Sequence, residues 1–197
     1  MSRWAFILTL LLLPAYLTAH PHVWIDAHAE IHFDEERLDR IVHRWVFDEM
    51  FTESILLDFD GNRNRAIEPA ESRAIEEDAF SNLRHYGYFT HLTIGSREIP
   101  VTSVEQFRAS LEADRLVYRF EIPVDVEVRD RWQRISLGVW DDTYFVEVSY
   151  DSPAAAVYGA RDQGVEIDIA LQDNPGKSYW GGFITPQEIR LAYRKAP

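Results

Sequence analysis

The sequence predicts a mainly β protein of the α+β class: an antiparallel β-sandwich, or two packed sheets, with one helix-loop-helix segment inserted between strands. Short alternating segments bounded by turn residues recur along most of the chain, and this pattern is typical of strands. Helical spacing of apolar side chains is concentrated at about residues 48–85. The chain has no cysteine, so we expect the fold to be stabilised by a core and by metal rather than by disulfides.

The first nineteen residues have the pattern of an export signal. Arg3 gives a positive start, residues 4–13 are apolar, and residues 17–19 offer a signal peptidase site before His20. The stretch is shorter than the roughly 20 apolar residues that span a bilayer, so we expect cleavage rather than a retained anchor. Residues 20–197 are then expected to form a single β-rich domain with no membrane span.

The charge of the chain is strongly negative. Removing residues 1–19 removes only Arg3, which leaves 33 acidic and 19 basic residues (20 minus 1), a difference of 14 negative charges. Such a surface repels nucleic acid phosphates and attracts cations, so no nucleic acid partner is expected. An acidic surface also keeps an exported protein soluble without any further role.

A long hairpin is predicted at the start of the exported part. Residues 21–33 alternate strictly between apolar and polar side chains, and the polar face is rich in histidine and carboxylates. Residues 34–36 make a turn. Residues 38–47 then return as a second strand, with apolar side chains at every second position and so on one face. Because His43 lies on this apolar side, we expect it to be a core residue.

An EF-hand-like segment follows the hairpin. Apolar side chains recur at helical spacing before and after the twelve residues DGNRNRAIEPAE, which begin at Asp60. The oxygen donors of a calcium loop fall at positions one, three, five, seven, nine and twelve, and here these are Asp60, Asn62, Asn64, the carbonyl of Ala66, Glu68 and Glu71. We therefore predict a Ca²⁺ site within an inserted helix-loop-helix at about residues 48–85.

This calcium loop departs from the usual pattern at position six, where Arg65 replaces glycine. A residue with a Cβ in the left-handed conformation costs about 1 kcal/mol, so the site should be weakened but not abolished. There is also no second loop to pair with the first. We expect a structural Ca²⁺ site of millimolar to high micromolar affinity; the alternative is a degenerate helix-loop-helix that serves only packing.

Strand signals resume after the helical segment. Seven further strands are predicted at residues 89–94, 97–101, 104–111, 116–122, 134–140, 144–150 and 165–171, which makes nine with the first hairpin. Near the end of the chain, Thr185 and Glu188 have the spacing of a capping box, so a short terminal helix is predicted there.

A second metal site is predicted at the new N-terminus. An N-terminal His20 chelates a metal through its amino group and imidazole together, and His22 adds a nitrogen from the same strand face. Pro21 has no N–H and so blocks a square-planar peptide chelate. The predicted ion is Zn²⁺, Ni²⁺ or Cu²⁺. His28 lies roughly 20 Å from His22 along a strand and is not expected to join; the alternative is a solvated terminus that binds no metal.

Several segments together resemble one protein family. These are His20–Ile25, Trp45–Glu49, the calcium-loop segment, Tyr88–Thr90 and Asp142–Tyr144, and they are similar to the domain-of-unknown-function 1007 family. The resemblance covers residues 20–150. It implies a Gram-negative periplasmic protein described as a component of an uncharacterised ABC-type transport system, with a link to nickel and cobalt export. The family loop usually carries Asp-Gly where this chain has Asn64 and Arg65.

The sequence thus predicts a non-enzymatic periplasmic metal-binding accessory protein that works with a membrane transporter of nickel, cobalt or zinc-type cations. One alternative is the solute-binding component of an ABC-type transporter, although such receptors usually have two α/β lobes. A second is a structural adaptor of a membrane transporter without metal chemistry. A third is a copper oxygenase, which requires another histidine that the fold brings near the terminal one.

Overall fold

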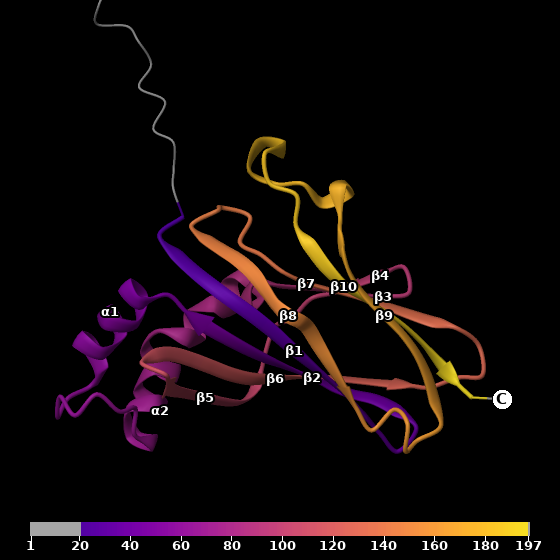
Figure 1. Cartoon of the computed structure of the whole chain (residues 1–197), viewed down its shortest axis with the longest axis horizontal. Helices are drawn as coiled ribbons and strands as arrows, with labels where there is room; N and C mark the ends of the chain where they lie inside the picture. The colour runs from indigo at the N-terminus through magenta and orange to yellow at the C-terminus, as the bar shows by residue number, and fades with distance from the viewer. Residues whose placement is uncertain (1–20, 197) are drawn as a thin grey trace, which may run out of the picture.

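The protein is described by a computed structural model over residues 21–196, so the predicted export signal, residues 1–19, and His20 lie outside the described residues. Within this range ten strands form two five-stranded sheets that pack together (Figure 1). The predicted mainly β architecture of two packed sheets is confirmed.

The first sheet, sheet A, has the strand order β5-β6-β2-β1-β8. Its strands are β1 (Val23–Asp34), β2 (Arg37–Phe47), β5 (Glu105–Glu112), β6 (Arg115–Glu127) and β8 (Val146–Tyr158). β1 and β2 form the predicted antiparallel hairpin, in which Ala29 lies opposite His43. Burial alternates along β1 as the sequence pattern predicted, because every second side chain of a strand points to the same face.

The second sheet, sheet B, has the order β4-β3-β7-β10-β9. Its strands are β3 (Thr90–Ile94), β4 (Arg97–Ile99), β7 (Gln133–Val139), β9 (Val165–Asp173) and β10 (Gln187–Lys195). Buried apolar side chains of both sheets form one core. Trp45 of sheet A lies at its centre, fully buried, with its ring edge-to-face against Phe120 at 4.8 Å between centroids.

One strand pairing differs from the antiparallel prediction. Seven of the eight pairings are antiparallel, but β8 runs parallel to β1, with Val23 opposite Val146. A parallel pairing needs a long crossover between its strands. The chain provides one, because β2 and β8 are separated by the helical segment and by strands of both sheets.

The predicted terminal helix is wrong, since residues 187–195 form strand β10 between β7 and β9. Thr185 does not cap a helix; its hydroxyl lies 3.1 Å from that of Ser178. The physical reason is burial with period two: Ile189, Leu191 and Tyr193 all face the core. Pairing with strands on both sides outweighs a local capping pattern.

The helices lie at one end of the molecule, beside β5 and β6 (Figure 1). They are α1 (Glu49–Phe59), α2 (Pro69–Asp78) and the 3₁₀ segment η1 (Phe80–Phe89), while η2 (Pro175–Lys177) and η3 (Trp180–Gly182) lie in a later loop. Asp48 caps α1 by accepting the N–H of Phe51 at 2.9 Å. Of the helices in residues 21–196, none combines the length and apolar character needed to cross a membrane.

Candidate functional site

The loop between α1 and α2 is organised around the carboxylate of Asp60. Asp60 Oδ1 accepts the N–H of Asn64 at 3.2 Å, and Oδ2 accepts the N–H of Arg65 at 2.8 Å. Asp60 is also 7% exposed, although the loop after it is largely open to solvent. The loop backbone therefore curls around a single carboxylate at the end of α1.

Glu71 joins the two ends of the same loop. Its Oε1 accepts the N–H of Gly61 at 3.1 Å, and its Oε2 accepts the N–H of Glu68 at 2.9 Å. The second contact belongs to a capping box that starts α2, in which Pro69 occupies the first turn. The Glu71 carboxylate therefore links the start of the loop to the start of α2.

The remaining side chains of the loop meet at Glu68. The amide nitrogen of Asn62 donates to Glu68 Oε2 at 3.0 Å, and that of Asn64 donates to Glu68 Oε1 at 2.7 Å. The amide oxygens accept loop N–H groups: Asn62 Oδ1 from Asn64, and Asn64 Oδ1 from Ala66. All six predicted donor residues thus belong to one hydrogen-bonded loop, and their oxygen chemistry fits a hard cation such as Ca²⁺.

The residue at loop position six adopts the backbone conformation that normally requires glycine. Arg65 has φ 57°, in the left-handed region. Its guanidinium donates to both carboxylate oxygens of Glu53 in α1, at 2.7 and 3.1 Å. The pKa of the Glu53 carboxyl is lowered by this hydrogen bond, and the pKa of Arg65 is raised. The ion pair is exposed to solvent and ties the loop to α1.

Both helices are attached to the β5–β6 hairpin by buried hydroxyl groups. Thr52 of α1 accepts the N–H of Leu116 at 3.0 Å, and Ser72 of α2 accepts the N–H of Ala109 at 2.9 Å. Because β5 is the edge of sheet A, the second contact satisfies an edge amide that no strand pairs. Sheet A therefore supports both helices through these two contacts.

His22, the described member of the predicted N-terminal site, is held at the start of β1. Its N–H donates to the carbonyl of Phe145 at 2.8 Å, and its exposed ring lies 4.9 Å from the Phe145 ring. Buried Asp141 shapes the segment that carries Phe145 by accepting N–H groups of Thr143, Phe145 and Val146 at 2.9–3.1 Å. In the sequence, this turn is indicated only by the residues Asp141, Asp142 and Thr143, which are typical of turns.

The other histidines of β1 are engaged elsewhere. His28 Nδ1 lies 2.9 Å from the carbonyl of Pro153, and His32 Nε2 lies 3.2 Å from Glu30. Neither joins His22. Among residues 21–196, no group of three or more His, Asp or Glu side chains gathers as a metal cluster.

His43 is a core residue, as the sequence predicted, and His91 also packs against a neighbouring ring. His43 is 1% exposed and has Thr90 Oγ1 3.4 Å from its Nε2. Burial lowers the pKa of His43 to about 3. His91 stacks on Trp140 with 3.5 Å between ring centroids and an interplanar angle of 3°. Burial also lowers the pKa of His91.

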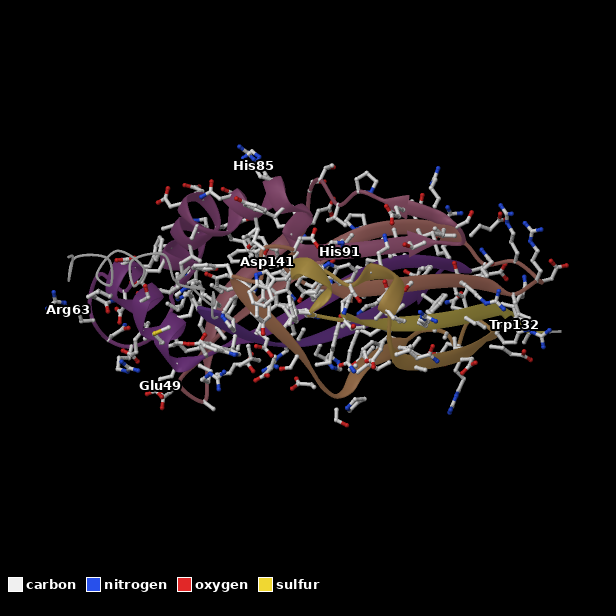
Figure 2. The ribbon with its side chains drawn as sticks, turned by 90° about the horizontal axis from the view of Figure 1, so that it is seen from above. Glu49, Arg63, His85, His91, Trp132 and Asp141 are labelled. Atoms are coloured by element: carbon white, nitrogen blue, oxygen red, sulfur yellow. The ribbon has the colours of Figure 1, made fainter. Side chains whose placement is uncertain are left out.

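The labelled side chains show how these regions are distributed (Figure 2). Arg63, in the loop between α1 and α2, lies at one end of the molecule, and Trp132 lies near the other. His91 and Asp141 lie between them. The loop between α1 and α2, marked by Arg63, and the turn that contains Asp141 are therefore separate features of the surface.

Comparison with known proteins gives the family of the chain. An uncharacterized 15.5 kDa protein from the trpE 3′ region of Spirochaeta aurantia is 29% identical over 132 residues, which cover 67% of this chain and 93% of that protein. An uncharacterized protein of Haemophilus influenzae is 24% identical over 150 residues, which cover 75% of this chain and 71% of that protein. The family model described as "Protein of unknown function (DUF1007)" matches residues 5–169, so the chain belongs to the DUF1007 family.

Proposed function

We propose that the protein is a non-enzymatic, periplasmic metal-binding accessory protein of a divalent-cation transporter. In this proposal residues 48–85 are an EF-hand-like insert that binds Ca²⁺, and the processed N-terminus binds a transition ion. The calcium ligands are Asp60, Asn62, Asn64, the carbonyl of Ala66, Glu68 and Glu71. The calcium site has a structural role, since in this proposal it fixes the pair of helices α1 and α2.

The observation that carries the proposal is the convergence of the loop on Asp60 and Glu71. Asp60 organises the first half of the loop, and Glu71 reaches back from α2 to the N–H of Gly61. Helices on both sides of residues 60–68 agree with such a site. Binding is weak, because Glu68 must exchange its contacts with Asn62 and Asn64 for the ion.

The transition-metal part of the proposal rests on chemistry at the chain start. His22 is exposed and its backbone is fixed by Phe145, so its imidazole is available to a metal at the end of β1. His20 supplies an amino group and a second imidazole when cleavage occurs before it. The periplasmic location rests on the predicted export signal. The transporter partner, of the nickel, cobalt or zinc type, is what the family resemblance implies.

Calorimetric titration of the processed protein with Ca²⁺ tests the calcium site. We expect saturable binding to the native protein and a loss of affinity of at least about tenfold in Glu71→Gln, which removes the bidentate ligand. Glu77→Gln is the matched control, because Glu77 is an exposed carboxylate of the same helix and lies outside the loop. Equal Ca²⁺ affinities of the two variants would contradict the proposed site.

Titration with Ni²⁺, Zn²⁺ and Cu²⁺ tests the N-terminal site. His22→Gln is expected to weaken binding of the preferred ion, whereas His28→Gln, on the same strand, is expected to leave it unchanged. N-terminal sequencing establishes whether His20 begins the exported chain. Absence of binding of all three ions to protein that starts at His20 rejects the transition-metal site and leaves the calcium site to be judged separately.

A further inference from the structure

Trp140 lies on the outer face of sheet B, over a glycine. A Cβ on Gly138 would stand 2.1 Å from Trp140 Cζ3, so the indole occupies the space that a side chain of β7 would otherwise fill. His91 stacks on this indole at 3.5 Å, and Tyr179 stacks at 6.4 Å between centroids. Trp140 is 3% exposed. The missing side chain at Gly138 thus creates a fixed aromatic wall on an otherwise polar sheet face.

A buried carboxylate stands beside this wall. Glu188 of β10 is directly opposite Gly138 in the antiparallel register, and opposed residues point their side chains to the same face about 5 Å apart. Glu188 is 5% exposed. Its Oε2 accepts the hydroxyl of Ser136 at 2.5 Å and lies 3.9 Å from Arg190 Nε. In the part of the chain that the structure describes, Glu188 Oε1 receives no hydrogen bond or ion pair.

This environment leaves the charge of Glu188 incompletely compensated. A buried carboxylate is costly unless a cation and hydrogen bonds satisfy it. The Glu188 carboxylate accepts one hydrogen bond, from a neutral hydroxyl. The nearest described cation is Arg190, whose side chain is 46% exposed and donates to Gln172 at 3.2 Å. The carboxylate therefore retains the capacity to bind a further cationic group.

Two cavities give access to Glu188. Their volumes are about 550 and 560 Å³, and both are lined by Glu188, Thr93, Glu98 and Lys177. Lys177 forms an ion pair with Glu98, so its charge is engaged by that carboxylate. The second cavity is also lined by His91 and Trp140. A small ligand in it meets a carboxylate and the edge of an aromatic stack together.

We propose that Glu188 binds an organic ammonium group of a small solute in the cavities beside Trp140. A carboxylate that accepts ammonium hydrogens is a usual recognition chemistry for such a cation. A metal ion fits less well, because in the described part of the chain no group of three His, Asp or Glu side chains that could hold one lies at these cavities. The inference does not depend on the proposed calcium site or on the N-terminal histidines.

Putrescine is a suitable probe, and 1,4-butanediol is its neutral counterpart of the same length. Calorimetric titration of the purified protein is expected to give saturable binding of putrescine and none of butanediol. The Glu188→Gln variant keeps the shape of the side chain and removes its charge, so it should weaken putrescine binding by at least about tenfold. In NMR spectra, the indole N–H resonance of Trp140 should shift when putrescine is added to the native protein, and it should not shift in the Glu188→Gln variant.

Two further variants separate recognition from folding. Ser136→Ala removes the one hydroxyl that donates to Glu188 and leaves the charge, so putrescine binding should be retained. Glu105→Gln removes an exposed carboxylate that lines neither cavity and should also have no effect. Equal binding of putrescine and butanediol, or undiminished putrescine binding by folded Glu188→Gln protein, overturns the proposal. So does a failure of putrescine to bind the native protein.

Discussion

The guanidinium of Arg65 forms two hydrogen bonds with the carboxylate of Glu53, and it does so from a residue with left-handed backbone. The two observations have opposite energetic consequences. The left-handed conformation costs about 1 kcal/mol for a residue with a Cβ, while an exposed ion pair of this kind contributes about 0–1 kcal/mol. The two energies are of similar size, so the arginine at position six is tolerated in the loop. Its positive charge does not favour binding of a cation there.

Replacement of Arg65 by glycine should tighten Ca²⁺ binding. Arg65→Gly relieves the left-handed conformation at position six and removes a positive charge that lies beside Asp60, whose carboxylate accepts the Arg65 N–H. We expect an increase in Ca²⁺ affinity of roughly fivefold to tenfold, measured by calorimetric titration at fixed ionic strength.

The neighbouring Arg63→Gly variant is the matched control. Arg63 also has a left-handed backbone, with φ 58°, and carries the same charge, but it lies outside the predicted donor set. It should gain stability without a comparable gain in affinity. If both variants tighten Ca²⁺ binding equally, general charge rather than the geometry of position six controls the loop.

The contact between Ser72 and Ala109 should be important for attachment of α2 to sheet A. Ser72→Ala leaves the buried N–H of Ala109 without its acceptor, which costs about 1–3 kcal/mol. Urea denaturation measures the loss. Ser81→Ala removes an exposed hydroxyl that donates to the carbonyl of Glu77, and it should change the free energy of unfolding by less than about 0.5 kcal/mol. A similar small effect of Ser72→Ala would show that α2 is held by its apolar face alone.

The first hairpin was predictable because one face of it is buried. Alternation with period two fixes the register of such a strand, and the observed burial along β1 follows the sequence pattern. The end of the chain was not predictable in the same way. Its capping-box spacing is a local signal, whereas β10 is held by two neighbouring strands that are distant in sequence.

The same distinction applies to the candidate sites. The donor spacing of residues 60–71 is local, so it was visible in the sequence, and the left-handed backbone of Arg65 follows from its loop position. Glu188 was interpreted only as a capping residue, because its burial depends on a strand that was expected to be a helix. The support of the helices by Thr52 and Ser72 likewise depends on the distant β5–β6 hairpin.

An alanine at position 138 should displace Trp140 from the face of sheet B. Its Cβ would overlap the indole, and overpacking of this kind costs about 1–3 kcal/mol. Loss of the stack would expose His91, whose pKa is lowered chiefly by burial. We therefore expect Gly138→Ala to reduce stability in urea and to raise the pKa of His91 toward its ordinary value, as followed by NMR. Gly61→Ala, where a Cβ meets no atom within 4 Å, should leave the pKa of His91 unchanged.

The buried imidazole of His43 should make the protein less stable in mild acid. Burial lowers its pKa to about 3, so the unfolded chain binds a proton near pH 6.5 that the folded protein does not bind. Stability from this group is complete above pH 6.5 and falls as the pH decreases toward 3. For a single histidine the expected loss between pH 7 and pH 5 is about 2 kcal/mol in the free energy of unfolding.

Urea denaturation of native protein and of His43→Leu at these two pH values measures that loss. The variant lacks the titrating group. The loss in its free energy of unfolding between pH 7 and pH 5 should therefore be about 2 kcal/mol smaller than the loss in the native protein. His85→Leu is the control, because His85 lies in η1 with an exposed side chain and should keep the pH dependence of the native protein. Parallel pH profiles for the native protein and His43→Leu would contradict this prediction and show that the folded protein does not disfavour protonation of His43.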